Sequence, residues 1–287
     1  MEIIKKHNEE AKMGKHTYEL RANSMTDYTQ EAYLKRFVRL KEVVHPESLP
    51  QNEVNAEDKE ALRRAIRHSP NDDTYIPETL DWRDLGFITK PKNQLSCGSC
   101  YAFSVATSIE AQIFRRTGMV VPLSAQQFVD CSIDWGNGAC QGGNFRGTLQ
   151  YLQSTNGLMR ETDYPYASEQ QECMYNPNLS VVNVTRWAIL PKKDEKSLVK
   201  AIAQYGPIPI TINAAPKSFQ LYSHGIYSDS SCTDKMVNHA MLAVGYTPDY
   251  FILQNWWGDR WGETGYMKIE RHRNRCGLAN YAAYAMV

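Results

Sequence analysis

The sequence predicts an α+β protein in which a mostly helical lobe precedes a mostly β lobe. Residues 100–190 begin with a helical run, AFSVATSIEAQIFRR, and continue into segments rich in Gly, Cys and Tyr. Residues 205–270 carry strand patterns instead: PIPITIN, AMLAVGY, YFILQNW and GYMKIER, separated by Gly, Pro and Asp turns. A chain of 287 residues can bury a sizeable core in one large domain or in two lobes.

The first 75 residues differ from the rest of the chain in charge density and in cysteine content. They hold 27 of the 64 Lys, Arg, Asp and Glu residues and none of the seven cysteines. Apolar residues such as Ile4, Leu34 and Phe37 recur among these charges in a helical pattern. Residues 51–75 are mostly polar, which predicts an exposed segment open to proteases. We therefore expect a leader, residues 1–75, and a main domain, residues 76–287, although composition alone leaves an ordinary solvated helical domain equally open.

The charge balance argues against nucleic-acid and membrane-surface partners. Lys plus Arg and Asp plus Glu both number 32, so the formal net charge is zero, whereas such partners select a basic face. No apolar run approaches the roughly 18 residues of a membrane span. We expect no nucleic acid, no membrane, no metal and no cofactor, and we expect a monomer.

Cysteine usage points to an oxidising compartment. An odd number of cysteines in one region suggests three disulfides and one free thiol, and disulfides on that scale imply an oxidising environment. The N-terminal residues MEIIKKHNEEAKMGKH nevertheless lack the apolar stretch of a secretory signal. We therefore expect that a signal and some further sequence precede Met1. The seven cysteines are Cys97, Cys100, Cys131, Cys140, Cys173, Cys232 and Cys276.

The pair Cys97 and Cys100, in NQLSCGSCYAFS, allows three interpretations. A redox dithiol belongs in a compact βαβ unit, and no such pattern surrounds the pair. A zinc site needs a second ligand pair at finger-like spacing, which the other cysteines do not supply. The third interpretation, one half-cystine beside one reactive thiol, requires a base and an orienting group elsewhere in the chain.

His239 and Asn255 are the candidates for that base and that orienting group. His239 directly precedes the apolar strand AMLAVGY, where an imidazole can be oriented and shielded from water. Asn255 follows the strand YFILQ and precedes Trp256 and Trp257. An Asn side chain can hold a histidine in one tautomer, and aromatic cover protects that hydrogen bond. The other histidines lie in polar or turn segments.

These motifs together resemble the papain family of cysteine proteases, and in particular its cathepsin L-like branch. NQLSCGSCYAFS resembles the nucleophile motif, whose C-G-[SA]-C-[WY] pattern is distinctive. DCS and GACQGGN resemble the downstream cysteine-glycine motif. VNHAMLAVGY resembles the histidine strand, and QNWWGDRWGETGYMKI the asparagine motif. DWRDLGFIT (81–89) resembles the start of the mature enzyme. The resemblance implies a two-lobed papain-like fold, with a helical lobe, a β-barrel-like lobe and an active-site cleft between them.

The leader resembles the inhibitory propeptide of the same family. Ile4 and Asn8 keep the spacing of the end of its helical motif. Asn23, Met25 and Asp27 keep the spacing of G-x-N-x-F-x-D, although Arg21 and Met25 depart from that pattern. The resemblance therefore implies that residues 1–75 are a propeptide, shortened at its N-terminus, that acts as an intramolecular inhibitor.

The resemblance also implies a role for each residue of the site. Cys100 would be the nucleophile, at a helix start that favours a thiolate. His239 would be its imidazolium partner and Asn255 would orient His239. Gln94 would donate to the oxyanion together with the backbone N–H of Cys100. The implied disulfides are Cys97–Cys140, Cys131–Cys173 and Cys232–Cys276, which leave Cys100 free.

The remaining implied site residues bind substrate. Gly143 would present its backbone to an extended peptide, and an apolar pocket that includes Thr211 would take the P2 side chain. The full set of substrate-binding candidates is Gly142, Gly143, Phe145, Val237, Ala240, Trp257 and Tyr281.

Three residues depart from the family pattern beside these motifs. Tyr101 stands in place of the usual Trp, Leu95 in place of Gly, and Trp256 in place of Ser. Leu95 lies between Gln94 and Cys97, where it could disturb Gln94 or narrow the cleft.

The sequence thus predicts a cysteine endopeptidase made as a zymogen, cleaved near Tyr75–Thr79 and active on polypeptides in the lysosome or outside the cell. An exopeptidase of the same family would need a segment that blocks one end of the cleft, and no His-rich insertion follows Cys131. A catalytically silent homologue that binds partners is the alternative of a different class.

Overall fold

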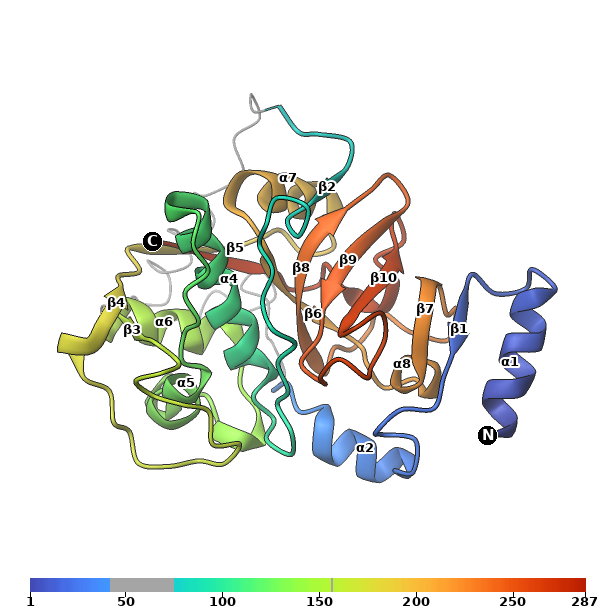
Figure 1. The fold of residues 1–287 in the computed structure, drawn as a ribbon, viewed down its shortest axis with the longest axis horizontal. Helices are drawn as coiled ribbons and strands as arrows, with labels where there is room; N and C mark the ends of the chain where they lie inside the picture. Colours follow the sequence, from blue (N-terminus) through green and yellow to red (C-terminus); the bar gives the residue numbers. More distant parts are fainter. Residues whose placement is uncertain (42–74, 156) are drawn as a thin grey trace, which may run out of the picture.

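The computed structural model describes residues 1–41, 75–155 and 157–287. Figure 1 shows a lobe of helices beside a lobe built on a β-sheet, with residues 1–41 of the leader running along the β lobe to the junction of the two. Apart from Tyr75, the predicted exposed segment 51–75 lies outside the described residues.

The helical lobe is built around α4 (Cys100–Thr117), whose first twelve residues are all buried. Their side chains are almost all apolar, small or hydroxyl-bearing, so no face of this part of the helix is suited to water. Its buried carboxylate, on Glu110, is paired with Lys92 at 2.6 Å. The helix ends at Gly118, which takes the left-handed conformation that favours glycine. The other elements here are α5 (Ala125–Cys131), η2 (Ile133–Trp135), η3 (Ala139–Gln141), α6 (Phe145–Thr155), β3 (Leu158–Met159), η4 (Pro177–Leu179) and β4 (Ser180–Val182).

The β lobe is a sheet in the order β1-β7-β10-β9-β8-β2, with β6 paired to β8. Strand β8 is central, and all eight of its residues are buried. It pairs antiparallel with both β6 and β9, which satisfies its backbone on both sides. The strands are β2 (Leu80–Asp81), β6 (Ile208–Ile212), β7 (Tyr222–Tyr227), β8 (His239–Tyr246), β9 (Tyr250–Gln254) and β10 (Tyr266–Glu270).

The rest of the chain connects the two lobes. Strands β5 (Arg186–Ile189) and β11 (Ala283–Met286) pair antiparallel and carry the C-terminus towards α4. Helix α7 (Glu195–Tyr205) covers β6 and β8, with Leu198 and Ile202 buried. The short elements α8 (Lys217–Gln220) and η5 (Arg275–Gly277) lie in the β lobe. The predicted order of a helical lobe followed by a β lobe is confirmed.

The described part of the leader, residues 1–41, contains α1 (Glu2–Lys12), β1 (Tyr18–Leu20) and α2 (Gln30–Phe37). Strand β1 extends the sheet by pairing antiparallel with β7. Asn8 holds α1 against β1, because its side chain both donates to and accepts from the backbone of Leu20 at 2.9 Å. Asn23 donates to the carbonyl of Gln220 in the β lobe at 2.8 Å. Both residues were picked out by spacing, and both anchor the leader.

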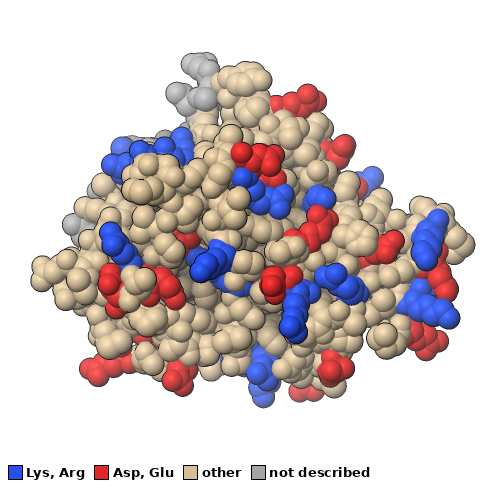
Figure 2. Space-filling model, viewed as in Figure 1, with Lys and Arg blue, Asp and Glu red and all other residues tan. Residues whose placement is uncertain are grey.

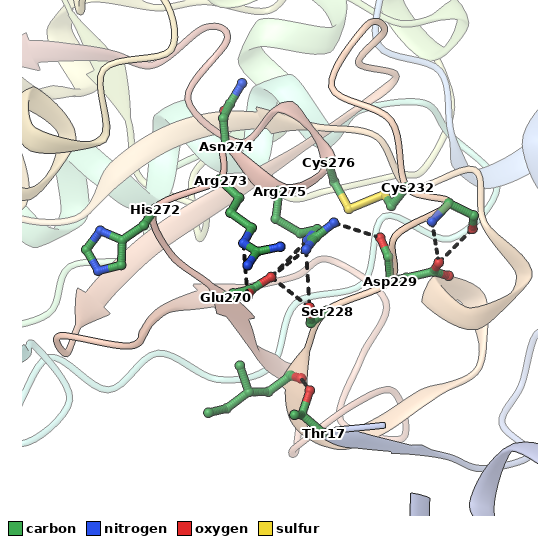
Figure 3. Close-up of polar contacts among 12 residues, drawn as sticks. Thr17, Ser228, Asp229, Cys232, Glu270, His272, Arg273, Asn274, Arg275 and Cys276 are labelled. Carbon is green, nitrogen blue, oxygen red and sulfur yellow. Dashed lines mark hydrogen bonds and ion pairs between the residues drawn. A yellow bond between two sulfur atoms is a disulfide. The ribbon is translucent and has the colours of Figure 1, made fainter. Parts of the chain in front are cut away.

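The edge on which β1 docks is stabilised by a polar cluster (Figure 3). Arg275 donates to the carboxylate of Glu270 at 2.6 Å and contacts Ser228, which follows β7. The disulfide Cys232–Cys276 lies beside this cluster. On the same edge, the hydroxyl of Thr17 donates to the carbonyl of Ile226. The leader thus adds its strand to an edge that side-chain contacts already hold in place.

Tyr33 of α2 anchors the described part of the leader at a second place. It is fully buried, its hydroxyl donates to the carbonyl of Ala214 at 2.6 Å, and its ring lies edge-on to Trp257 at 5.8 Å. Through these two contacts, Tyr33 attaches the leader to the main domain.

We expect Tyr33→Ala to loosen the leader strongly and Tyr33→Phe to loosen it mildly. Truncating a buried aromatic side chain costs about 3–5 kcal/mol, whereas losing one hydrogen bond costs about 1 kcal/mol. Amide hydrogen exchange at Arg21 and Ile226, whose N–H groups bond across the β1–β7 pair, measures the difference. Tyr75→Ala is the control, since that ring is 85% exposed. Equal exchange in all variants would contradict the assignment.

Candidate active site

Cys100 is the first residue of α4, and its side chain has no exposed surface. It is the free cysteine of the chain, because the other six form three disulfides. The pairs are Cys97–Cys140, Cys131–Cys173 and Cys232–Cys276, the same pairs that the family resemblance implies. Cys97–Cys140 ties the loop before the helix to the loop that carries Gly142 and Gly143.

His239 begins β8 and is also fully buried. Its Nε2 lies 2.8 Å from Oδ1 of Asn255, the residue that follows β9. Since an amide oxygen only accepts, Nε2 carries the proton and Nδ1 is free to accept one. Nδ1 has no hydrogen-bond partner within the described part of the chain. Trp257 stacks on the imidazole, with ring centroids 4.8 Å apart, and shields it from water.

Helix α4, which begins at Cys100, packs against β8, which begins at His239. The backbone N–H groups of Tyr101 and of Ala240, the residue after His239, lower the pKa of the Cys100 thiol against the larger effect of burial. Helix α4 therefore presents the thiol to the start of β8. The three residues that the sequence motifs predict as a catalytic set therefore lie at the junction of the two lobes: Cys100, His239 and Asn255.

Burial holds both groups in their neutral forms in this leader-docked state. It raises the pKa of the Cys100 thiol to about 12 and lowers the pKa of the His239 imidazole to about 4. The Asn255 hydrogen bond opposes the shift at His239, and backbone N–H groups oppose the shift at Cys100, but desolvation is the larger effect at each. The helix start favours a thiolate, yet here it does not overcome the loss of water.

The leader segment Phe37–Lys41 forms hydrogen bonds with both walls of the site. The side chain of Gln94 donates to the carbonyl of Phe37 at 3.3 Å. The N–H of Leu40 donates to the carbonyl of Asn238 at 2.9 Å, and that of Lys41 donates to the carbonyl of Gly143 at 3.1 Å. These backbone contacts are those expected of a peptide lying in the cleft.

Gly142 makes room for this segment, and Gly143 makes room for two side chains of the main domain. Gly142 has a φ of +101°, and a Cβ there would lie 1.7 Å from the carbonyl oxygen of Arg39. A Cβ on Gly143 would lie 2.5 Å from Oδ1 of Asn137 and 2.8 Å from the ring of Tyr101. Only glycine permits so close an approach of the backbone at these positions.

Gln94 is buried beside Cys100, and its side-chain amide is held in one orientation. Its Nε2 donates to the carbonyls of Cys97, at 3.0 Å, and Phe37. The hydroxyl of Tyr166 donates to the backbone carbonyl of Gln94 at 2.8 Å and also forms a hydrogen bond with the hydroxyl of Ser99. Tyr166 was not among the predicted site residues, because its local sequence, YPYA, carries no signal of this contact.

Leu95 does not disturb Gln94. Its side chain is 50% exposed, and its backbone has a φ of +53°, in the left-handed region. A residue other than glycine pays roughly 1–2 kcal/mol there. Its N–H donates to the side chain of Asn93 at 2.9 Å, which helps to hold this turn.

The predicted pocket residues fall into two groups. Phe145, Ala240 and Tyr281 belong to one buried apolar cluster that also contains Leu40 of the leader, and Val237 packs against that cluster. The Phe145 and Tyr281 rings are 6.1 Å apart. Thr211 is buried and bonds the Tyr281 carbonyl. Trp257 lies apart from this group, on His239 and Tyr33.

We also searched the described residues for a metal site, a membrane-spanning helix and a surface of one charge sign. They contain no group of three or more His, Cys, Asp and Glu side chains that could hold a metal ion. Among these residues, no helix combines the length and the apolar character needed to cross a bilayer. Figure 2 shows Lys and Arg interspersed with Asp and Glu over the visible face, without a field of one sign.

Comparisons with known proteins agree with this geometry. A family model described as "Papain family cysteine protease" matches residues 76–286. Cathepsin 7 of Rattus norvegicus is 40% identical over 77% of this chain and 69% of its own length. Cathepsin K of Mus musculus is 36% identical over 98% of this chain and 82% of its own length.

A solved structure of digestive procathepsin L 3 from Tenebrio molitor larval midgut superposes with a TM-score of 0.85 and 31% identity. The superposition covers 99% of this chain and 88% of that one. The two-lobed architecture is therefore the papain-like fold, in a form similar to a proenzyme. The chain belongs to the papain family of cysteine proteases.

Proposed function

We propose that this chain is the zymogen of a cysteine endopeptidase. The observation that carries the proposal is the arrangement of Cys100, His239 and Asn255: an unpaired thiol at the start of a buried helix, beside an imidazole whose far nitrogen is bonded to an amide oxygen. This is the arrangement that an activated sulfur nucleophile requires.

Each step of hydrolysis has a residue to perform it. When the leader leaves, water and substrate enter, and the Cys100 proton passes to Nδ1 of His239. The thiolate attacks the peptide carbonyl, and the oxyanion accepts hydrogen bonds from Nε2 of Gln94 and the N–H of Cys100. His239 then protonates the leaving amine, which departs and leaves a thioester. Water, deprotonated by His239, hydrolyses the thioester and restores the thiol.

The leader would act as the inhibitor of the same site. Residues 37–41 occupy the cleft through backbone hydrogen bonds and keep water from Cys100 and His239. Residues 1–75 would thus be the propeptide and residues 76–287 the peptidase, with cleavage near Tyr75–Thr79. The family match over residues 76–286 supports that division.

The cleft would bind an extended polypeptide. Gly143 and Asn238, which bond the leader backbone, would offer their carbonyls to substrate. Phe145, Ala240 and Tyr281 would receive an apolar P2 side chain, as they share a cluster with Leu40 of the leader. Three disulfides support an oxidising location, lysosomal or extracellular.

The first test separates an enzyme from a silent homologue. Removal of the leader should yield a protein that hydrolyses a peptide with a P2 leucine, and Cys100→Ala should reduce turnover to background. A thiol-directed epoxide should label the processed protein once, at Cys100, under reducing conditions that spare its disulfides. Binding of the peptide without turnover or labelling would favour the silent homologue.

The second test concerns the oxyanion. Gln94→Ala should lower kcat by about 10²–10³, or about 2.7–4 kcal/mol of transition-state stabilisation, with a smaller change in KM. The reason is that the amide donates most strongly to the charge that develops during attack. Gln170→Ala, an exposed amide, is the control. Equal kcat values for the two variants would remove Gln94 from the mechanism.

The third test concerns pH. The pKa of His239 is about 4 with the leader docked, below its ordinary value of 6.5. Protonation therefore favours the undocked state, so docking should be strongest above pH 6.5 and weaken as pH falls towards 4. Amide exchange of the leader in a Cys100→Ala protein, corrected for intrinsic pH effects, measures this.

The variant His239→Gln should lose part of that pH dependence, since glutamine does not titrate. His7, whose pKa is lowered mainly by burial, is a second source of the same sign. His7→Gln therefore serves as the comparison. Leader exchange that slows on acidification, or that responds identically with and without His239, would overturn the assignment.

A further inference from the structure

Trp256 occupies the floor of the junction between the lobes. It follows Asn255, has no exposed surface and stands where the family pattern has a serine. Its ring stacks on Phe103 of α4, with centroids 5.8 Å apart and planes 22° from parallel. It therefore packs the sequence after β9 directly against the helix that carries Cys100.

The indole N–H joins that helix to the histidine strand. Nε1 lies 3.0 Å from both Oγ of Ser104 and the carbonyl oxygen of Ala240. An indole nitrogen can only donate, so both oxygens share its hydrogen. The Ser104 hydroxyl in turn donates to the carbonyl of Cys100 at 2.8 Å. One side chain thus connects the first turn of α4 with the residue that follows His239.

The backbone of Trp256 contacts two further candidate site residues, Gln94 and Asn255. Its carbonyl accepts the N–H of Gln94 at 2.8 Å. Its own N–H donates to Oδ1 of Asn255 at 2.8 Å, the same oxygen that bonds His239. The side-chain contacts could be lost by substitution at position 256, whereas these backbone contacts could be retained.

We infer that Trp256 is a positioning residue for the hydrolytic reaction, which sets the separation of the Cys100 thiol from the His239 imidazole. Its indole fixes the position of α4 relative to β8. The attack requires these two elements to hold the thiol and the imidazole at the correct separation. A displacement of about 1 Å between reacting groups can cost about 10²-fold in rate. This inference rests on the proposed function, since it concerns the geometry of that reaction.

The variant Trp256→Phe keeps an aromatic ring against Phe103 and removes the N–H. We expect kcat of the processed enzyme to fall about 10- to 100-fold with KM little changed. Ser104→Ala removes the hydroxyl that accepts the indole hydrogen bond. It should lower kcat by a smaller factor, again with KM little changed. The double variant should lose less than the product of the two, because both act through one contact.

The pH profile gives a readout that a merely structural role would not move. An imidazolium beside a thiolate lowers the thiol pKa and raises the imidazole pKa, so a close pair gives a broad bell. If Trp256→Phe separates the pair, both limbs should move inward and the bell should narrow. The pH dependence of Cys100 alkylation should show the same shift of the thiol limb without any need for turnover.

The matched control is Trp82→Phe, which also removes one buried indole N–H, bonded to the carbonyl of Ile202 at 3.0 Å. It should lower the melting temperature while leaving kcat and the pH profile as they are. A Trp256→Phe enzyme that matches Trp82→Phe in all three measurements would overturn the inference. Absence of turnover and alkylation in the unsubstituted processed protein would instead overturn the proposed function. If Trp256→Phe does not fold, Ser104→Ala alone decides, by the same narrowing or its absence.

Discussion

Desolvation of the Cys100–His239 pair is the constraint on which the rest of this structure depends. A thiol and an imidazole buried together are held neutral, with pKa values of about 12 and about 4, and neither can act as a charged group. The fold creates this condition with two components. Cys100 lies in the buried first turns of α4 and His239 is the buried first residue of β8, and the leader segment Phe37–Lys41 forms hydrogen bonds with Gln94, Asn238 and Gly143.

The leader achieves this mainly through its backbone. Strand β1 pairs with β7, and the N–H groups of Leu40 and Lys41 bond carbonyls on opposite walls of the cleft. Side chains such as Asn8, Asn23 and Tyr33 fix where the leader docks, but the contact with the site itself depends on main-chain atoms. The same carbonyls would be available to any extended peptide, which is why an inhibitory segment and a substrate can share one groove.

Much of the fold was predictable from local patterns. The alternation of strand and turn residues over 205–270 predicted the sheet lobe, and the confirmed family assignment followed from motifs around Cys100, His239 and Asn255. The site roles remain proposals, although the structure brings these residues within reach of one another. Trp257 is predicted to bind substrate, and in the leader-docked structure it stacks on His239 and lies edge-on to Tyr33. A motif identifies an aromatic position but not the face that the ring presents.

The sequence by itself determined the α+β class, the odd cysteine and the family, because these depend on composition, periodicity and short motifs. Only the tertiary structure decided that Cys100 and His239 are neutral in this state, since their pKa values depend on burial among segments that are remote in sequence. The tertiary structure also decided where Trp256 lies. The sequence identifies this residue as a departure from the family pattern but does not indicate its role. Trp256 contacts Ser104, Ala240 and Gln94, which lie in segments remote from one another in sequence. A local sequence pattern cannot predict contacts between such segments.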